Sequence, residues 1–490
     1  MASYLKPEDI AGYLGVSKFW YNTLLPLRWR TVRMAWSFVH RRCLSRYRHL
    51  SGPHLDVLRR HQHLILDLTI VASYFVDLDQ WTFSNLKTLT LGLPSVHLPE
   101  GRTMSLDFMG AFPKLTKLNL TSSIDVTREV WSTLSAHSHV TSLSLNDVEV
   151  QKISGPAFWR LCAKLENLAL EEVYFEDGTT SENTVFDRIR RLKLVDVEGL
   201  DAKSQLDLII RCPNLKGLHW KYVPFDYTHY WDSGMTPPLS VFHSIPKGNW
   251  PYLDDLDVGV NDLDVSIDDA DLASILEGIS GGLRLLKLRE LDLSKQMSSA
   301  LGRHYNTLVK LDLGDCSLNE GFDLLNILCN CPNLEILHSR DGLDAGDVAK
   351  EGPWACRLLR ELTLGFWFGE DDQDYHQDVL GRLSTLDRLE SLEIFYRLYD
   401  DKPNMYKNSG FGFRLDLGLG QLASLRQLKT LTFDSSSYCN IKPQLGMEEV
   451  EWMATNWTKL ERVAGQFSGS PDENAKLKDA FIRRGVEVCE

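Results

Sequence analysis

A six-residue unit recurs along most of the chain and constrains its fold more than any other feature. It reads aliphatic, two variable residues, Leu, one variable residue and a second apolar residue, as in LKTLTL ending at Leu91 and LVKLDL ending at Leu313. Its central leucine occurs thirteen times, at Leu89, Leu118, Leu143, Leu168, Leu192, Leu218, Leu256, Leu291, Leu311, Leu337, Leu362, Leu392 and Leu431. A decayed copy, LERVAG, ends at Gly465.

The spacings between these leucines indicate a repeat. They are 29, 25, 25, 24, 26, 38, 35, 20, 26, 25, 30 and 39 residues, and most fall within the roughly 20–29-residue period of a leucine-rich repeat. Because alternate side chains of a strand face the same side, the last two apolar positions of each unit are expected to point into one core. SQLDLIIRC, ending at Cys212, and GFDLLNILC, ending at Cys329, have the apolar spacing of helices. The sequence therefore predicts an α/β leucine-rich-repeat solenoid, with a parallel sheet on its concave side and helices outside.

The composition limits the partners and the location. The formal net charge is −14, whereas nucleic acid or an anionic membrane as main partner would require a basic surface. No apolar run approaches the length of about eighteen residues that a membrane-spanning helix needs. Lys6, Glu8 and Asp9 lie where a signal peptide would need an apolar run. We therefore expect a cytoplasmic or nuclear protein with neither a nucleic-acid nor a membrane partner.

Four cysteines follow the repeat. Each lies three residues before the first aliphatic of a unit, a position that elsewhere holds an aromatic residue; these are Cys162, Cys212, Cys331 and Cys356, against Phe83, Phe112, Trp250, Tyr305 and Trp457. Cysteine is thus expected to act here as a small core residue. Only Cys329 and Cys331 are closely spaced, and a zinc site would need further ligands nearby. We expect no metal and no cofactor, and a reducing compartment.

The first residues do not follow the repeat and carry a resemblance to a known family. Tyr4-Leu5, Pro7, Asp9-Ile10, Val16-Ser17-Lys18 and Trp20 resemble the second half of an F-box. The run SKFWYNTLLPLRWRTVRM is similar to fungal F-box proteins in which this block leads into leucine-rich repeats. The repeat from Leu308 to Leu334 resembles the cysteine-containing leucine-rich repeat of ubiquitin-ligase substrate receptors. Since an F-box normally opens with a Leu-Pro helix, the motif is expected to be N-terminally truncated.

The resemblance implies a domain organisation and a function. Residues 1–45 would be a partial F-box-like helical segment that docks on the adaptor of an SCF-type ubiquitin ligase, with contacts from Leu5, Pro7, Ile10, Val16 and Trp20. Residues 46–470 would be a solenoid of about thirteen to fourteen irregular repeats that holds a target protein for ubiquitination, and residues 471–490 a C-terminal cap. The alternative is that the first segment only caps the first repeat. The chain would then be a free-standing interaction scaffold without a ligase tether.

Motifs for catalysis are weak. The sequence contains no Walker-type phosphate loop and no HExxH. GFGFRLDLGLG, at 410–420, lacks the three-glycine dinucleotide fingerprint between a strand and a helix. We therefore expect a non-catalytic protein.

Charged residues occupy the variable positions of the strand units, which are expected to face the concave surface. Basic residues come first, at Arg190, Arg191, Lys193 and Lys216, and acidic ones follow, at Asp254, Asp255, Asp257, Glu290, Asp292 and Asp312, with Arg289 and Lys310 interspersed. One interpretation is an ordinary solvated face. The other is a bipolar surface whose acidic stretch meets a basic segment of the partner. The second predicts Arg191, Lys193, Asp255, Asp257, Asp292 and Asp312 as substrate-binding residues.

Two insertions interrupt the repeat, at Lys221–Trp250 and at Phe395–Gly420. Long loops in compact arrays are often functional. Tyr227, Tyr230 and Trp231 of the first insertion could form a contact patch, as such aromatic residues do at interfaces, or pack over the edge of the sheet.

Overall fold

The computed structural model describes most of the chain. The described residues are 17–35, 59–71, 81–92, 112–126, 128–136, 139–176, 184–222, 248–260, 269–314, 316–318, 322–368, 375–395, 412–434 and 445–489. The chain divides into two compact units, unit 1 at Met1–Pro237 and unit 2 at Pro238–Glu490. In the part that is described, no helix is both long and apolar enough to span a membrane.

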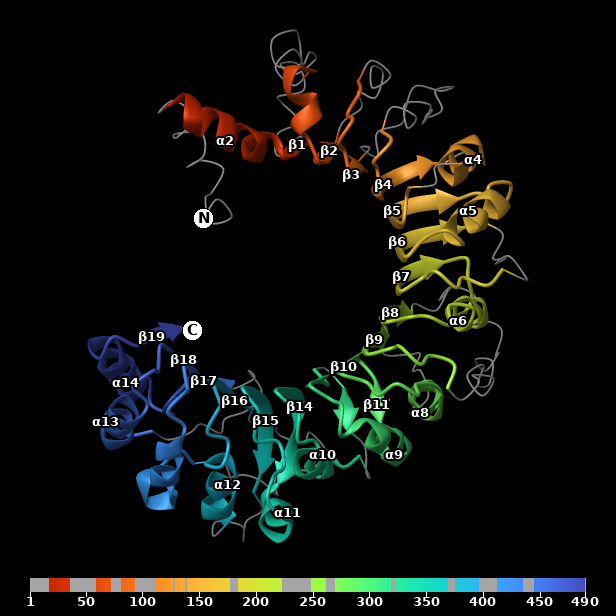
Figure 1. Ribbon diagram of the computed structural model, residues 1–490. Helices are drawn as coiled ribbons and strands as arrows, with labels where there is room; N and C mark the ends of the chain where they lie inside the picture. Colours follow the sequence, from red (N-terminus) through yellow and green to blue (C-terminus); the bar gives the residue numbers. More distant parts are fainter. Residues whose placement is uncertain are drawn as a thin grey trace. The chain divides into compact units, whose positions relative to one another are not determined.

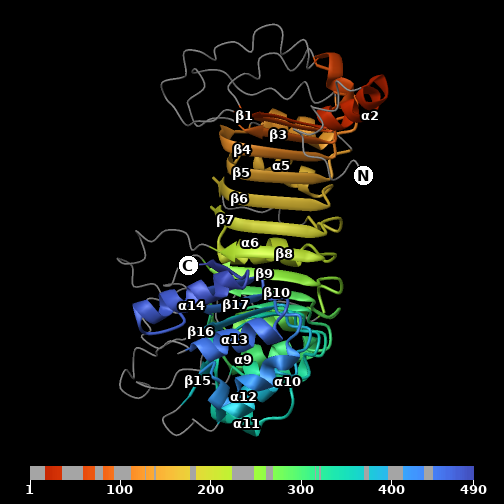
Figure 2. The same ribbon diagram turned by 90° about the vertical axis from the view of Figure 1, so that its left-hand side faces the viewer.

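Unit 1 contains a run of parallel strands, each paired with the next in sequence. They are β1 (Thr31–Ala35), β2 (Asp67–Val71), β3 (Thr88–Gly92), β4 (Lys117–Asp125), β5 (Ser142–Val150), β6 (Asn167–Phe175), β7 (Arg191–Glu198) and β8 (Gly217–Tyr222). Figure 2 shows these strands side by side. The central leucines are in register, as at Leu118, Leu143 and Leu168, and these three are at most 1% exposed. The predicted alternation between core and surface is thereby confirmed.

Helices follow several strands of unit 1 and lie on the outer side of the sheet (Figure 1). These are α4 (Arg128–Ala136), α5 (Gly155–Cys162) and α6 (Ala202–Ile210), whereas α2 (Lys18–Trp29) precedes β1 and the short helix η3 (Gln62–Leu64) precedes β2. Helix α6 is the predicted SQLDLIIRC helix, and Asp201 caps it by accepting a hydrogen bond from the Ser204 N–H at 2.8 Å. Leu206 and Ile209 are buried as expected, whereas Ile210 is half-buried and Leu208 is buried in addition.

Strands β5, β6 and β7 share a bend four residues after the central leucine. The bend residues are Asp147, Glu172 and Asp196, with φ of 56°, 52° and 52°. The next residue of each strand, Val148, Val173 or Val197, turns back into the core and pairs in register with its neighbours. The bend thus divides each strand into a first segment, which carries the leucines, and a second one.

Unit 2 repeats this arrangement. Its strands are β9 (Asp255–Val260), β10 (Leu285–Arg289), β11 (Asp292–Leu293), β12 (Lys310–Asp312), β13 (Ser317–Leu318), β14 (Ile336–Asp344), β15 (Glu361–Trp367), β16 (Ser391–Phe395), β17 (Thr430–Asp434), β18 (Arg462–Gly465) and β19 (Glu487–Cys489). Its helices are α8 (Asp269–Gly278), α9 (Lys295–Leu301), η7 (Gly302–His304), α10 (Leu324–Asn330), α11 (Ala345–Lys350), α12 (His376–Leu383), η9 (Leu415–Leu417), η10 (Leu419–Ser424), α13 (Met447–Asn456) and α14 (Pro471–Arg483). Both units are α/β solenoids of the leucine-rich-repeat type, as predicted.

One predicted repeat unit of unit 2 is wrong. Leu286, and not Leu291, is the central leucine, because it pairs in register with Leu256 on β9 and Leu311 on β12. Its unit, LRLLKL at 283–288, overlaps the predicted LRELDL at 288–293. Glu290, with φ of 56°, stands four residues after Leu286, as the bend residues of β5 to β7 do after their leucines. Leu291 therefore corresponds to Val148 beyond the bend, and β11 pairs with β13 in a separate two-stranded sheet.

The sheet also extends beyond the thirteen predicted units. Leu68 of β2 is in register with Leu89, and β1 adds Val32 beside Leu68. At the other end, Val463 of the decayed copy LERVAG pairs with Leu431, and β19 adds Val488 beside it. Strands therefore occur within residues 1–45 and 471–490, and the functional boundaries proposed there stay predictions.

The position three residues before the first aliphatic of a unit is a core position, as predicted. Cys162, Cys212, Cys331 and Cys356 are 0% exposed, and all four are free thiols. The backbone carbonyl at this position also accepts a hydrogen bond from the N–H of the first aliphatic residue of the unit. For example, the Leu359 N–H donates to the Cys356 carbonyl at 3.2 Å. Burial raises the pKa of Cys331 and of Cys356 to about 12. These thiols are therefore protonated and unreactive at neutral pH.

Candidate functional site: the strand face

The exposed face of the sheet is the candidate site in each unit. We define the strand face as the side chains directly before and after the central leucine of each strand. These positions alternate with the buried leucines, so the chain pattern that builds the core also presents two columns of residues to solvent. On β5, for example, Ser142 and Ser144 are half-buried while Leu143 and Leu145 are buried. The strand face is thus free of core packing and open to variation.

On β2 to β6 of unit 1, the strand-face column after the central leucine carries small side chains, most of them polar, and the column before it includes the charged residues Asp67 and Lys117. The column after the leucine reads Thr69, Thr90, Asn119, Ser144 and Ala169 in consecutive register. Asn119 Nδ2 donates to Thr90 Oγ1 at 2.7 Å. These short side chains leave hydroxyl and amide groups close to the strands, where they can hydrogen bond to a partner's backbone.

Basic side chains gather on and beside β7 and β8 of unit 1. Arg191 and Lys193, both predicted binding residues, flank Leu192 on this face, and Arg191 is exposed. Lys193 Nζ lies 2.8 Å from Glu171 Oε1 on the neighbouring strand β6. Lys216 precedes β8 and is exposed, and Lys221 lies near its end and is half-buried. The structure thus brings together the basic residues that the sequence grouped.

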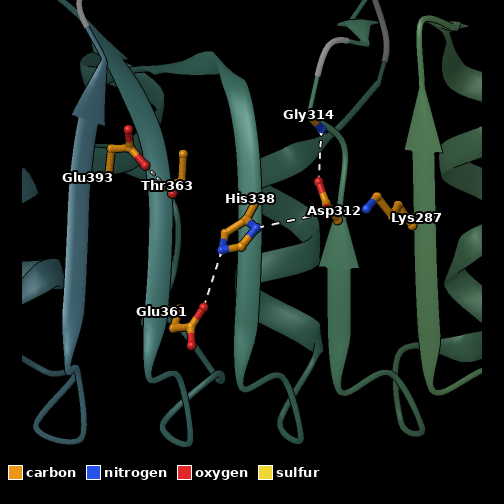
Figure 3. Close-up of polar contacts among 7 residues, drawn as sticks. All are labelled: Lys287, Asp312, Gly314, His338, Glu361, Thr363 and Glu393. Atoms are coloured by element: carbon orange, nitrogen blue, oxygen red, sulfur yellow. Dashed lines mark hydrogen bonds and ion pairs between the residues drawn. The ribbon is translucent and has the colours of Figure 1, made fainter. Parts of the chain in front are cut away.

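In unit 2 the column after the leucine is a ladder of charged and polar side chains, which we call the polar ladder. On β9, β10, β12, β14, β15 and β16, which pair with one another in this order, it reads in register Asp257, Lys287, Asp312, His338, Thr363 and Glu393. Figure 3 shows its middle part. Lys287 Nζ and His338 Nδ1 approach Asp312 Oδ2 from opposite sides at 3.8 and 3.9 Å. His338 Nε2 lies 3.5 Å from Glu361 Oε2, and Thr363 Oγ1 donates to Glu393 Oε2 at 3.1 Å.

Asp312 is the most strongly held group of the polar ladder. Burial by itself would raise the pKa of its carboxyl, and its side chain is 14% exposed. His338, the Gly314 N–H at 3.2 Å and the charge of Lys287 outweigh that effect and lower the pKa to about 2. Asp312 is therefore ionised and committed to partners within the chain at neutral pH.

The predicted acidic stretch is therefore interrupted, which corrects the sequence interpretation. Lys287 stands between Asp257 and Asp312, and Leu285 stands between Asp255 and Lys310. Asp292 is not on the strand face of the main sheet, because it lies on β11 beyond the bend. The error has one cause, since the shift of the central leucine from Leu291 to Leu286 replaces the neighbours Glu290 and Asp292 by Leu285 and Lys287.

An apolar row, which sequence reasoning missed, lies beside the polar ladder. Leu285 precedes Leu286 on β10 and is 38% exposed, although its neighbours Leu286 and Leu288 are buried. Lys310 of β12 and Ile336 of β14 follow in the same column, both half-buried. The stem of Lys310 can cover apolar surface between the two aliphatic residues. We call Leu285, Lys310 and Ile336 the apolar row; its signal in the sequence was the unassigned unit LRLLKL.

Other predicted site residues lie outside the described part of the chain. Leu5, Pro7, Ile10 and Val16 precede residue 17, and Tyr227, Tyr230 and Trp231 lie within 223–247. Trp20 belongs to helix α2, but its side chain is not among those described. Beside it on α2, the side chain of Phe19 is 70% exposed.

Among the residues that the structure describes, few side chains are grouped in a way that could bind a metal ion or catalyse a reaction. Within the described residues, no group of three or more His, Cys, Asp or Glu side chains is arranged to hold a metal ion. Gly278-Ile279-Ser280-Gly281-Gly282 matches the G-x-S-x-G pattern of serine hydrolases. It follows helix α8 and precedes strand β10, whereas the hydrolase nucleophile stands on a turn from a strand into a helix. The match therefore does not indicate an active site.

Comparisons with known proteins found weak likenesses among solved structures, and these carry no argument. No protein-family model matches the chain, and no curated protein sequence does. Among solved structures, the chain is similar to an internalin from Listeria monocytogenes, with 14% identity, 88% of each chain covered and a TM-score of 0.41. It is also similar to the plant peptide hormone receptor RGFR1 in complex with RGF2, with 13% identity and a TM-score of 0.38 over 86% of this chain and 56% of that one. A third is TLR13 in a complex with ssRNA13, with 14% identity and a TM-score of 0.36 over 88% of this chain and 55% of that one. The register of the parallel strands and their buried leucines establish this chain as an α/β leucine-rich-repeat solenoid.

Proposed function

We propose that this protein is a non-catalytic scaffold that binds a partner protein through its strand face. The observation that carries the proposal is the apolar row of unit 2 beside the polar ladder. Leu285 is 38% exposed on a rigid sheet, and charged side chains such as Lys287 and Asp312 border it. An apolar centre with a polar rim is the composition of protein interfaces. Because the sheet fixes these groups, a partner could bind them with little loss of side-chain freedom.

The polar ladder supports the specificity of such an interface. The pair of Asp312 with Lys287 holds opposite charges at fixed places, and His338 Nε2 lies 3.5 Å from Glu361 Oε2 beside it. Complementary charges on a partner would select it and set its register, while like charges would be rejected. In this proposal Arg191, Lys193, Asp255, Asp257 and Asp312 remain predicted contact residues on the strand face.

Replacing Leu285 with Glu should remove partner binding without unfolding the protein. Leu285 is exposed, so a charged side chain is tolerated there, but it would be buried against the partner without a counter-charge. We expect at least about a tenfold loss of affinity, since hot-spot residues at interfaces contribute about 2 kcal/mol or more and a tenfold change corresponds to about 1.4 kcal/mol. Partners recovered by affinity purification from cells expressing the chain, with each variant purified in parallel, provide the measurement.

The matched control is Ile153→Glu. Ile153 is 67% exposed in the turn before α5, away from the strand face. Proteins that are lost with the Leu285 variant and kept with the Ile153 variant are strand-face partners. Equal recovery with both variants and the unaltered protein would refute this role of the strand face.

A finer proposal is that the protein is the substrate receptor of an SCF-type ubiquitin ligase. It rests on the resemblance of residues 4–20 to an F-box and on their place before the repeats. The protein would act by proximity, holding a target near the ligase. Trp20→Ala should abolish co-purification with the ligase adaptor while leaving strand-face partners bound. If the unaltered chain fails to capture the adaptor, the free-standing scaffold is the better description.

A further inference from the structure

Basic side chains gather at one end of unit 1, and few of them have a partner in the chain. Arg191 and Lys193 are on β7, Lys216 precedes β8, and Lys221 is on β8. We call these four residues the basic face. Lys193 is paired with Glu171 at 2.8 Å. Among the residues that the structure describes, Arg191, Lys216 and Lys221 form no ion pair.

The carboxylates of strand β7 lie at and beyond its bend. On β7 the acidic residues are Asp196, at the bend, and Glu198, beyond it. The bend therefore separates them from the segment that carries Arg191 and Lys193. Unpaired cations at the surface of a sheet attract an anionic ligand at short range, where screening by salt is incomplete.

We propose that the basic face binds a segment of a partner protein that is rich in Asp and Glu. The proposal rests on the proposed function, because it names the chemistry of a partner that the strand face would hold. Charge complementarity is its first support. The second is the neighbouring part of the same face, where Thr90, Asn119 and Ser144 offer hydroxyl and amide groups to a peptide backbone.

A nucleic acid fits this surface less well than an acidic peptide does. A polyphosphate backbone needs cations along its whole track, and its affinity falls steeply with salt. On β3 to β6 the strand face carries small neutral side chains and a single cation, Lys117, and the whole chain carries a net charge of −14. The short basic face therefore matches a short acidic cluster.

The test compares two variants of equal charge. One carries Arg191→Glu and Lys216→Glu; the other carries Arg128→Glu and Arg160→Glu, on the outer helices α4 and α5. All four replaced side chains are exposed, so both variants should fold, which their thermal melting checks. Fluorescence anisotropy measures binding of a labelled poly-glutamate peptide and of single-stranded DNA of matched length, each at low and at physiological ionic strength.

We expect the peptide to bind the unaltered protein, and the first variant to weaken its Kd about tenfold or more. The loss of two charged contacts and the added repulsion give this magnitude. The helix variant should stay within about twofold. No binding by the unaltered protein, or an equal loss in both variants, overturns the proposal. Tighter binding of DNA, lost in the first variant, would make the basic face a nucleic-acid surface instead.

The proposed function is tested separately from this inference. If poly-glutamate does not bind but Leu285→Glu still removes partners, only the acidic-segment proposal fails. If Leu285→Glu has no effect while the peptide binds the basic face, the apolar row is not the interface. The two experiments use different units of the protein and different readouts.

Discussion

Gly199→Ala should lower the free energy of unfolding of unit 1 by about 2–5 kcal/mol. Gly199 follows β7 with φ of +76°, a conformation that costs an L-residue roughly 1–2 kcal/mol. A Cβ atom there would lie 1.9 Å from the Phe175 carbonyl oxygen on β6. Because that oxygen belongs to the backbone, the clash can be relieved only if the end of the strand shifts, which costs a further amount of about 1–3 kcal/mol. Urea unfolding followed by circular dichroism measures the loss.

The control for this prediction is Gly155→Ala. Gly155 begins helix α5, and no atom lies within 4 Å of a Cβ built on it. Alanine there should change the stability by less than about 1 kcal/mol, in the favourable direction, because it is the better helix former. Similar destabilisation by both alanines would mean that the close approach of Gly199 to Phe175 is not what matters.

His304→Ala should destabilise unit 2 by about 2–4 kcal/mol at neutral pH. His304 is 1% exposed, and its two ring nitrogens form hydrogen bonds with two backbone groups of the preceding repeat. Nδ1 accepts a hydrogen bond from the Leu283 N–H at 3.1 Å, and Nε2 lies 3.2 Å from the Leu276 carbonyl oxygen. These contacts assign the neutral ring with its proton on Nε2. Alanine would leave the Leu283 N–H buried without a partner, at about 1–3 kcal/mol. The Leu276 carbonyl would keep the Ile279 N–H at 3.1 Å and lose only the bond from His304, at about 1 kcal/mol. Denaturant unfolding measures the effect, and His139→Ala, at an exposed position of unit 1, is the control.

His304 should also make the stability depend on pH. Burial lowers its pKa; the hydrogen bond to the Leu276 carbonyl partly opposes this effect, and the charge of Arg303 adds a smaller lowering. The unfolded chain then binds more protons than the folded chain, so the stabilisation is present above the unfolded pKa of about 6.5 and is lost as the pH falls through the lower, folded value. The difference in unfolding free energy between the unaltered protein and His304→Ala should therefore shrink below about pH 6.5. If this difference in unfolding free energy stays constant from neutral pH down to about pH 5, the assignment of a neutral His304 ring is wrong.

Buried polar links such as that of His304 were not predictable from the sequence. Gln205 is a second example, since Nε2 donates to the carbonyls of Val197 and Leu200, and Oε1 accepts from Trp220 Nε1 at 2.9 Å. In the sequence Gln205 is one polar residue of an amphipathic helix, like many that face solvent. Its burial depends on the turn between β7 and α6, and this turn exists only once successive repeats have stacked.

The repeat pattern by itself determined the architecture of this protein. Leucines at fixed positions of a strand can all be buried only if successive strands pair in parallel and share one core. This requirement placed Leu118, Leu143 and Leu168 in register, and it placed Cys331 and Cys356 in the core. Local spacing was sufficient because the burial of each residue follows from its own place in the unit.

The tertiary structure decided which residues meet on the strand face. LRLLKL and LRELDL overlap at Leu288 and satisfy the local pattern equally well. Pairing with both Leu256 and Leu311 selected the first, and the bend at Glu290 turned the second away onto β11. That choice placed Lys287 beside Asp312 and exposed Leu285, so an expected acidic stretch became a polar ladder with an apolar row. The physical reason is that side-chain neighbours across a sheet are set by the register between strands, and this register depends on contacts that no single repeat contains.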